Sequence, residues 1–172
     1  MTKDAKEQHG AQAHAQLWEL IKDIRFAMFT VRDAGGHLTS RPMTTQNSAS
    51  DEDSSLWFFM SRTGSTVTDL AGDPQVNVAY ADPRKDAYVS VSGTATIRDD
   101  TAKKHKLWTK MTQAWFPGGP TDPHLVLVQV KVTHAEYWDV DTNQAVQLFK
   151  MAKAVVTGKP PDMGKHGDVH MA

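Results

Sequence analysis

Val89-Ser90-Val91-Ser92-Gly93-Thr94-Ala95-Thr96-Ile97 is the stretch that decides the fold of this 172-residue chain. Its apolar and small residues alternate with residues that carry hydroxyl groups. This period of two is typical of a strand with one face buried and the other face turned toward solvent. Val76 to Tyr80 alternates in the same way, and Val126 to Val132 predicts a long final strand. We therefore expect a sheet whose strands each bury one face.

The first half of the chain predicts three more strands. Phe26 to Arg32 is typical of a strand, and Gly35-Gly36 indicates a hairpin turn into a strand around Arg41. Leu56 to Met60 is apolar at every position, as expected for a strand that is covered on both faces. About six strands joined mostly by short turns predict a mainly β fold, an antiparallel barrel with helical additions.

Helical spacing predicts additions at the start, in the middle and at the end of the chain. The first helix is expected over His14 to Ile24, and a short one is expected to end at Ala71. Asp100 is expected to cap a single helix that carries Leu107, Trp108, Met111 and Trp115 on one side. A last helix is expected to begin at Asp141 and to stop at Gly158.

Size and composition are those of an ordinary globular protein with one core, at 40% hydrophobic residues. We expect a flexible N-terminus at residues 1–13, one domain at 14–158 and a tail at 159–172. A net charge of −1 provides no field that would attract nucleic acid, and no apolar run is long enough to span a membrane. The chain has no cysteine, which excludes disulfides and thiolate metal sites. A cytoplasmic protein that binds neither nucleic acid nor membranes is therefore expected.

Arg41 is the most informative single residue. Pro42 follows it, and because proline cannot donate to a sheet ladder, it marks an edge or a break in pairing. A guanidinium group is suited to bidentate contacts with phosphate. Gly64-Ser65-Thr66 begins a helix, where free backbone N–H groups bind phosphate well. These features predict a cradle for a phosphate monoester; the alternative is that Arg41 pairs with an acid of the Asp51-Glu52-Asp53 loop.

Other chemistry is weakly indicated. Trp115 lies beside a Gly-Pro loop, where its ring could cover a planar ligand, although packing or a dimer interface is the alternative. His166 and His170 are four residues apart, but Gly164 and Gly167 argue against a helix there, so we expect no metal site. Nucleophile, dinucleotide and P-loop motifs are missing from the sequence. No catalytic residue is therefore named.

Several short motifs resemble, in their order and spacing, those of a known family. They are Ser40-Arg41-Pro42-Met43, Trp57-Phe58-Phe59, Asp73 to Val78 and Ser92 to Ala95. In this order they resemble the pyridoxamine-phosphate-oxidase-like FMN-binding split barrels. Trp115 to Gly119 with Asp122-Pro123, and Ala135 to Asp139, are similar to the general stress protein 26 group of that family.

The resemblance implies a homodimer of six-stranded antiparallel split barrels with flanking helices, with FMN bound non-covalently at the subunit interface. It implies that Arg41 contacts the FMN phosphate and that the residues after it run past the flavin ring. The implied cofactor-binding positions are Arg41, Pro42, Met43, Thr44, Phe59, Met60, Ser61, Ser65, Thr66, Trp115 and Phe116. FAD or another phosphorylated ligand is the alternative occupant.

The chain departs from the family pattern at the phosphate site. The family usually has threonine at the position of Met60, serine at Gly64 and lysine at Thr66, so two hydroxyl groups and a cation are missing. Ser61, Ser65 and Thr66 are the available substitutes. One lost charge-assisted contact costs about 1.5–3 kcal/mol, roughly ten- to a hundredfold in affinity.

The resemblance predicts an FMN-dependent oxidoreductase of unknown substrate. The enzymes that oxidise pyridoxamine phosphate resemble one another in an arginine-rich C-terminal segment, whereas Arg98 is the last arginine here. Oxidation of pyridoxamine phosphate is therefore not expected. The alternative function is a non-catalytic flavin- or ligand-binding module, or an interaction module, with a weakened phosphate site.

Overall fold

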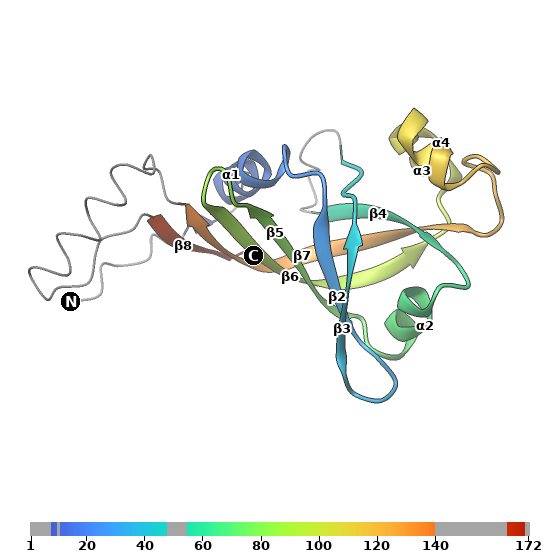
Figure 1. The fold of residues 1–172 in the computed structure, drawn as a ribbon, viewed down its shortest axis with the longest axis horizontal. Coiled ribbons are helices and arrows are strands. Elements are labelled where there is room, and N and C mark those ends of the chain that lie inside the picture. Colours follow the sequence, from blue (N-terminus) through green and yellow to red (C-terminus); the bar gives the residue numbers. More distant parts are fainter. Residues whose placement is uncertain (1–7, 10, 48–54, 140–164, 171–172) are drawn as a thin grey trace, which may run out of the picture.

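Strands dominate the computed structural model of the protein, which describes residues 8–9, 11–47, 55–139 and 165–170 (Figure 1). Neighbouring strands run antiparallel in the order β7-β6-β5-β2-β3, and β4 pairs with β7 outside this path. These six strands are β2 (Ala27–Arg32), β3 (Leu38–Met43), β4 (Ser55–Ser61), β5 (Gln75–Asp82), β6 (Ala87–Arg98) and β7 (Leu125–Asp139). They curl into a half-barrel, which confirms the predicted mainly β, six-stranded antiparallel split barrel with flanking helices.

Strand β7 pairs along both of its edges. One edge pairs with β6, and the other pairs first with β4 and then with β8 (Lys165–His170). The β6–β7 register shifts between Ser92 and Gly93. A Cβ atom at Gly93 would lie 2.6 Å from the carbonyl oxygen of Lys131, so a larger residue would push the two strands apart.

The two ends of the chain differ from the expectations. Helix α1 spans Ala11–Ile21, so it begins before His14 and ends before Ile24. The segment expected to be a C-terminal tail contains β8, which pairs with the free edge of β7, and β1 (Gln8–His9) pairs parallel with β8. The sequence did not reveal β8 because its pairing partner lies far away along the chain. The helix expected from Asp141 to Gly158 lies outside the described residues.

Two hydrophobic clusters lie on the two faces of β4, as the continuous apolar run predicted. Leu56, Phe58 and Met60 face the barrel interior, together with the buried residues of β5, β6 and β7. Trp57 and Phe59 belong to the second cluster, which also contains Leu107, Leu125 and Leu127. The predicted alternation in β6 is confirmed up to Ala95, whereas Ile97 is exposed near the end of the strand.

The helix expected after Asp100 is two helices, α3 (Thr101–Leu107) and α4 (Lys110–Trp115). The predicted cap is confirmed, because the Asp100 carboxylate accepts a hydrogen bond from the Lys103 amide at 2.9 Å. The helix breaks because the Thr109 hydroxyl accepts from the Thr112 amide at 3.2 Å and so caps a new helix. Trp115 is consequently exposed instead of sharing a buried face with Leu107.

Asp99 ties the start of α3 to the ends of β4 and β7. Its carboxylate accepts a hydrogen bond from the buried Lys104 ammonium at 2.8 Å and pairs with Arg62. Lys104 also donates to the carbonyl oxygen of Leu125 at 2.7 Å. The hydrogen bonds from Lys104 and Arg62 hold the pKa of Asp99 below its usual range. Within the described ranges, no helix is long and apolar enough to cross a membrane.

We expect Asp99→Asn to destabilise the protein at neutral pH, because it leaves the buried Lys104 ammonium without its counter-charge. Since the pKa of Asp99 is lowered on folding, its stabilising contribution is complete above the unfolded pKa of about 4 and disappears as the pH falls through the folded pKa. Urea unfolding from pH 8 to pH 3 should therefore show a difference from the parent protein that is constant above about pH 5 and shrinks below pH 4.

Asp23→Asn is the matched control for removal of a surface charge, because its carboxylate is exposed and lies 3.9 Å from the Lys85 ammonium. A difference between Asp99→Asn and the parent protein that stays undiminished at pH 3 would contradict the ionic role of Asp99.

Candidate functional site

Arg41 contacts the beginning of helix α2 (Ser65–Gly72). In the β2–β3 register Arg41 lies opposite the buried Phe29, near the barrel end where α2 packs against β2. Its guanidinium group donates a hydrogen bond to the Ser65 hydroxyl. Among the ion pairs of the described residues none involves Arg41, and the Asp51–Asp53 loop of the alternative interpretation lies outside these residues.

The start of α2 offers backbone donors beside this cation. Gly64 occupies the N-cap position, and no side chain there hydrogen-bonds to the first turn. The first amides of a helix have no intrahelical partners, and the helix dipole makes this end electropositive. Ser61, Thr63 and Ser65 add exposed hydroxyl groups close to the turn. The arrangement of guanidinium, amides and hydroxyls is suited to a phosphate group.

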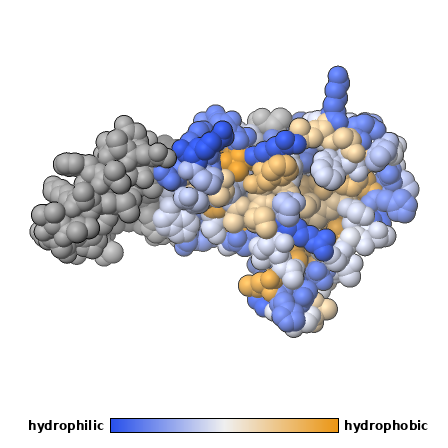
Figure 2. Space-filling view, viewed as in Figure 1, coloured by the Kyte–Doolittle hydropathy of each residue, from blue (hydrophilic) through white to orange (hydrophobic). Residues whose placement is uncertain are grey.

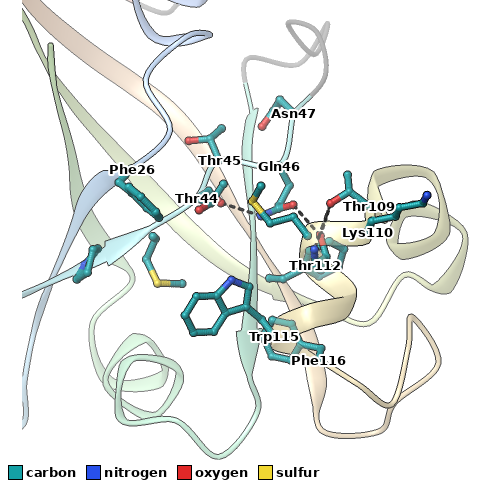
Figure 3. A pocket seen from close by; sticks show the side chains of 14 residues that line it. Phe26, Thr44, Thr45, Gln46, Asn47, Thr109, Lys110, Thr112, Trp115 and Phe116 are labelled. Carbon is teal, nitrogen blue, oxygen red and sulfur yellow. Dashed lines mark hydrogen bonds between the residues drawn. The ribbon is translucent and has the colours of Figure 1, made fainter. Parts of the chain in front are cut away.

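An apolar pocket of about 950 Å³ lies at the C-terminal end of β3 and begins with Pro42, the residue after Arg41 (Figure 3). One wall comes from the end of β3 and the residues that follow it, and the other comes from α4 and the loop after it. The lining residues are Phe26, Pro42, Met43, Thr44, Thr45, Gln46, Asn47, Phe59, Thr109, Lys110, Met111, Thr112, Trp115 and Phe116. Phe26 and Trp115 extend toward the mouth of the pocket from opposite walls (Figure 3).

Gln46 connects the two walls of the pocket. Its amide nitrogen donates to the Thr44 carbonyl oxygen at 3.0 Å, and its amide oxygen accepts from the Thr112 hydroxyl of α4 at 3.3 Å (Figure 3). Its backbone amide donates to the Trp57 carbonyl oxygen of β4 at 2.8 Å. One residue therefore joins the β3 extension, β4 and α4.

Asn47 and Thr45 stabilise the pocket wall formed by the residues after β3. The Asn47 side chain donates to the Ser55 carbonyl oxygen and accepts from the Trp57 amide, both at 2.9 Å. It therefore makes the two backbone hydrogen bonds that a neighbouring strand would make with β4. The hydroxyls of Thr45 and Tyr80 are 2.6 Å apart. Burial raises the pKa of Tyr80, against a smaller opposing effect of its hydrogen bond with Thr45, so the phenol stays protonated at neutral pH.

The expected cofactor-binding positions fall into three groups. Pro42, Met43, Thr44, Phe59, Trp115 and Phe116 line the pocket. Arg41 and Ser65 meet at the start of α2, with Ser61 nearby at the end of β4. The side chains of Met60 and Thr66 are buried, and Met60 belongs to the interior cluster rather than to the pocket lining.

Several lining residues were not anticipated from the sequence. Thr45, Gln46 and Asn47 follow shortly after β3. Thr109 caps α4 and Lys110 to Thr112 form its first turn, and the sequence did not separate α4 from α3. Phe26 directly precedes β2 and lies at the pocket mouth. A signal was available for Asn47, because an amide side chain after an edge strand can take the place of a backbone ladder.

Ionisable groups are scarce in the pocket. Lys110 is the one lysine, arginine, histidine or acid that lines it among the residues described. Within the same part of the chain, no three histidine or acidic side chains gather as a metal ion would require. The walls therefore offer shape, apolar surface and amide groups rather than an acid–base pair.

We expect Gln46→Leu to lower the free energy of unfolding by about 1–3 kcal/mol, because the Thr44 carbonyl loses the Gln46 amide and the Thr112 hydroxyl keeps only its contact with Thr109. Hydrogen exchange at the α4 amides of Gln113 and Phe116 should become faster, since α4 loses its tie to the opposite wall. Thr112→Val cuts the same contact from the other side. The double variant should show a coupling of at least about 0.5 kcal/mol in urea unfolding; strictly additive effects would contradict the connection.

Comparisons with known proteins agree with this geometry. The chain matches the family described as pyridoxamine 5'-phosphate oxidase like over residues 12–162. It is 31% identical over 150 residues to protein bli-3 of Neurospora crassa, which covers 82% of this chain and 71% of that protein.

Solved structures share the fold. A candidate general stress protein 26 from Jannaschia sp. CCS1 has a TM-score of 0.73 at 25% identity, covering 93% of this chain and 99% of that chain. A general stress FMN/FAD binding protein from Xanthomonas citri has a TM-score of 0.66 at 28% identity, covering 77% of this chain and 92% of that chain. The family match includes the described strands from β2 to β7 together with both walls of the pocket. The resemblance inferred from the motifs is thus confirmed, and the chain belongs to the pyridoxamine 5'-phosphate oxidase-like family.

Proposed function

We propose that this protein is a cytoplasmic, dimeric flavin-binding protein that uses FMN as an oxidoreductase cofactor. The observation that carries the proposal is the contact of Arg41 with Ser65 at the uncapped start of α2, because Arg41 directly precedes Pro42 and Met43, which line an apolar pocket. A flavin mononucleotide has the matching polarity, because a dianionic phosphate is joined to a flat, largely apolar ring. The related Xanthomonas citri protein bears the name FMN/FAD binding protein, which supports a flavin as the ligand.

The phosphate would be held by the Arg41 guanidinium and by the first backbone amides of α2, with Ser61 and Ser65 as hydroxyl donors. The ring would lie along Pro42 and Met43 in the pocket. Bound flavin supplies the redox chemistry, while the protein supplies binding, orientation and exclusion of water. The buried Met60 offers no hydroxyl, so phosphate binding depends heavily on Arg41.

FMN could be replaced by FAD at the same site, because both carry a phosphate on the ribityl chain. The alternative of a non-catalytic flavin- or ligand-binding module is favoured by the near lack of ionisable groups in the described pocket lining. Turnover of a reduced nicotinamide by the FMN-loaded protein decides between these functions: an oxidoreductase reduces its flavin, and a binding module leaves it oxidised.

We expect Arg41→Ala to weaken FMN binding about ten- to a hundredfold, because it removes the charge-assisted contact with the phosphate. Quenching of flavin fluorescence on titration of the protein measures this affinity. Arg41→Lys should recover only part of it, since an ammonium keeps the charge but not the bidentate fork.

Arg84→Ala is the matched control, because Arg84 lies in the β5–β6 turn and is 92% exposed. Circular dichroism establishes that each variant is folded. Unchanged FMN affinity in a folded Arg41→Ala protein would contradict the proposed phosphate site at Arg41.

The homodimer would form on the outer face of β2 and β3. Met28 and Leu38 are 44% and 67% exposed there, and Pro42 lies opposite Met28 in the register. In Figure 2, hydrophobic surface lies over the middle of the molecule, where Figure 1 places β2 and β3. Pro42 belongs to both this face and the pocket lining, so a second copy on the face would border the proposed flavin site.

Light scattering of the full chain should give about twice the monomer mass of 19.0 kDa. Met28→Glu should shift the population toward monomer, because it places a charge in an apolar interface. Tyr88→Glu is the control at another exposed apolar position, on β6. A parent protein that is monomeric at every concentration tested would contradict the dimer.

A further inference from the structure

Trp115 is an aromatic surface at the pocket mouth that nothing else in the described part of the chain covers. Its side chain is 75% exposed, the highest value among the exposed large hydrophobic residues of that part. The ring pairs recorded there, Phe29 with Phe58 and Phe59 with Trp108, do not include it. An exposed tryptophan on the wall of a concave site offers a flat face for a ring-shaped ligand.

Most polar side chains of the described pocket lining are already bonded within the protein. The side chains of Thr45, Gln46, Asn47, Thr109 and Thr112 all make hydrogen bonds to protein groups. Lys110 is the one ionisable side chain among the described lining residues, and Figure 3 shows its ammonium group directed away from the pocket. A charged ligand would therefore lose water here without gaining a counter-charge, which disfavours it.

The size of the pocket leaves room for a second molecule. At about 950 Å³ the pocket lies near the upper end of the range for small-molecule sites. A flavin held by Arg41 would enter from the β3 end, along Pro42 and Met43. Met111 and Trp115 of α4 lie on the opposite wall of the pocket.

We propose that Trp115 forms a second subsite in this pocket, for a flat, uncharged molecule of one or two fused rings. This deepens the proposed function, on which it rests only in assigning the β3 end of the pocket to the flavin. The chemistry selects neutral quinones and similar aromatic molecules, and it disfavours substrates that carry a phosphate or carboxylate.

The test measures binding of 2-methyl-1,4-naphthoquinone to the full chain by equilibrium dialysis, without FMN and at saturating FMN. Its anionic analogue, 1,4-naphthoquinone-2-sulfonate, is compared without FMN, so that repulsion from the flavin phosphate does not contribute. The protein has no cysteine, and thiol addition to the quinone therefore does not complicate the measurement.

We expect the neutral quinone to bind at least about tenfold tighter than the sulfonate, and Trp115→Leu to weaken it about two- to tenfold. Trp138→Leu is the matched control, because Trp138 is an exposed tryptophan of β7 outside the pocket lining and its loss should change nothing. Binding of the quinone should persist at saturating FMN.

Three kinds of outcome overturn the inference. Equal affinity for the neutral and anionic probes contradicts the charge argument. Unchanged quinone affinity in Trp115→Leu, or a change only in its oligomeric state, assigns the ring to packing between copies. Competitive displacement by FMN means that Trp115 contacts the flavin itself. If FMN fails to bind while the quinone binds, the proposed function is wrong and the subsite stands.

Discussion

The pairing of β7 along both edges is the constraint on which the rest of the structure depends. β6 occupies one edge, while β4 occupies the first half of the other edge and leaves the second half to β8. Both faces of β7 are buried in the first half of the strand. Leu125 and Leu127 belong to one hydrophobic cluster, and Val126 and Val128 belong to the other. The cluster that contains Leu125 and Leu127 packs against α3 and Trp108. This packing places α4 beside the open side of the barrel.

The split between β3 and β4 creates the site. Pro42 lies in β3, which ends the strand order and so needs no ladder on its outer edge. Beyond β3 the seam is closed by the backbone of Gln46 and the side chain of Asn47, not by a strand. Because these amides bond to β4 and α4, the space between the walls keeps a mainly apolar lining.

Positive charge and apolar surface lie in two neighbouring parts of the molecule. Arg41 and the start of α2 form an electropositive end, and the pocket beyond Met43 has one ionisable residue in its described lining. A ligand with an anionic tail and a flat ring satisfies both ends at once. The three positions at which the resemblance implies a departure from the family pattern are Met60, Gly64 and Thr66, and none of them is in the described pocket lining. If the proposed flavin site is correct, changes at these positions alter affinity for the phosphate and leave the shape of the ring site intact.

The sequence alone determined the elements whose signal is local. Period-two alternation identified β5 and β6, the continuous apolar run identified β4, and Asp100 marked the start of α3, because each depends on neighbours within a few residues. The order of short motifs also identified the family. Arg41 and Ser65 were expected together, and the structure shows them in contact.

Only the tertiary structure decided how distant segments meet. Thr112 and Gln46 are far apart in sequence, and their hydrogen bond turns a polar stretch and a short helix into the two walls of one pocket. The same holds for β8, whose pairing depends on an edge of β7 that β4 leaves free. Such contacts leave no periodic trace in the sequence, because their energy comes from side chains and strand edges that folding brings together.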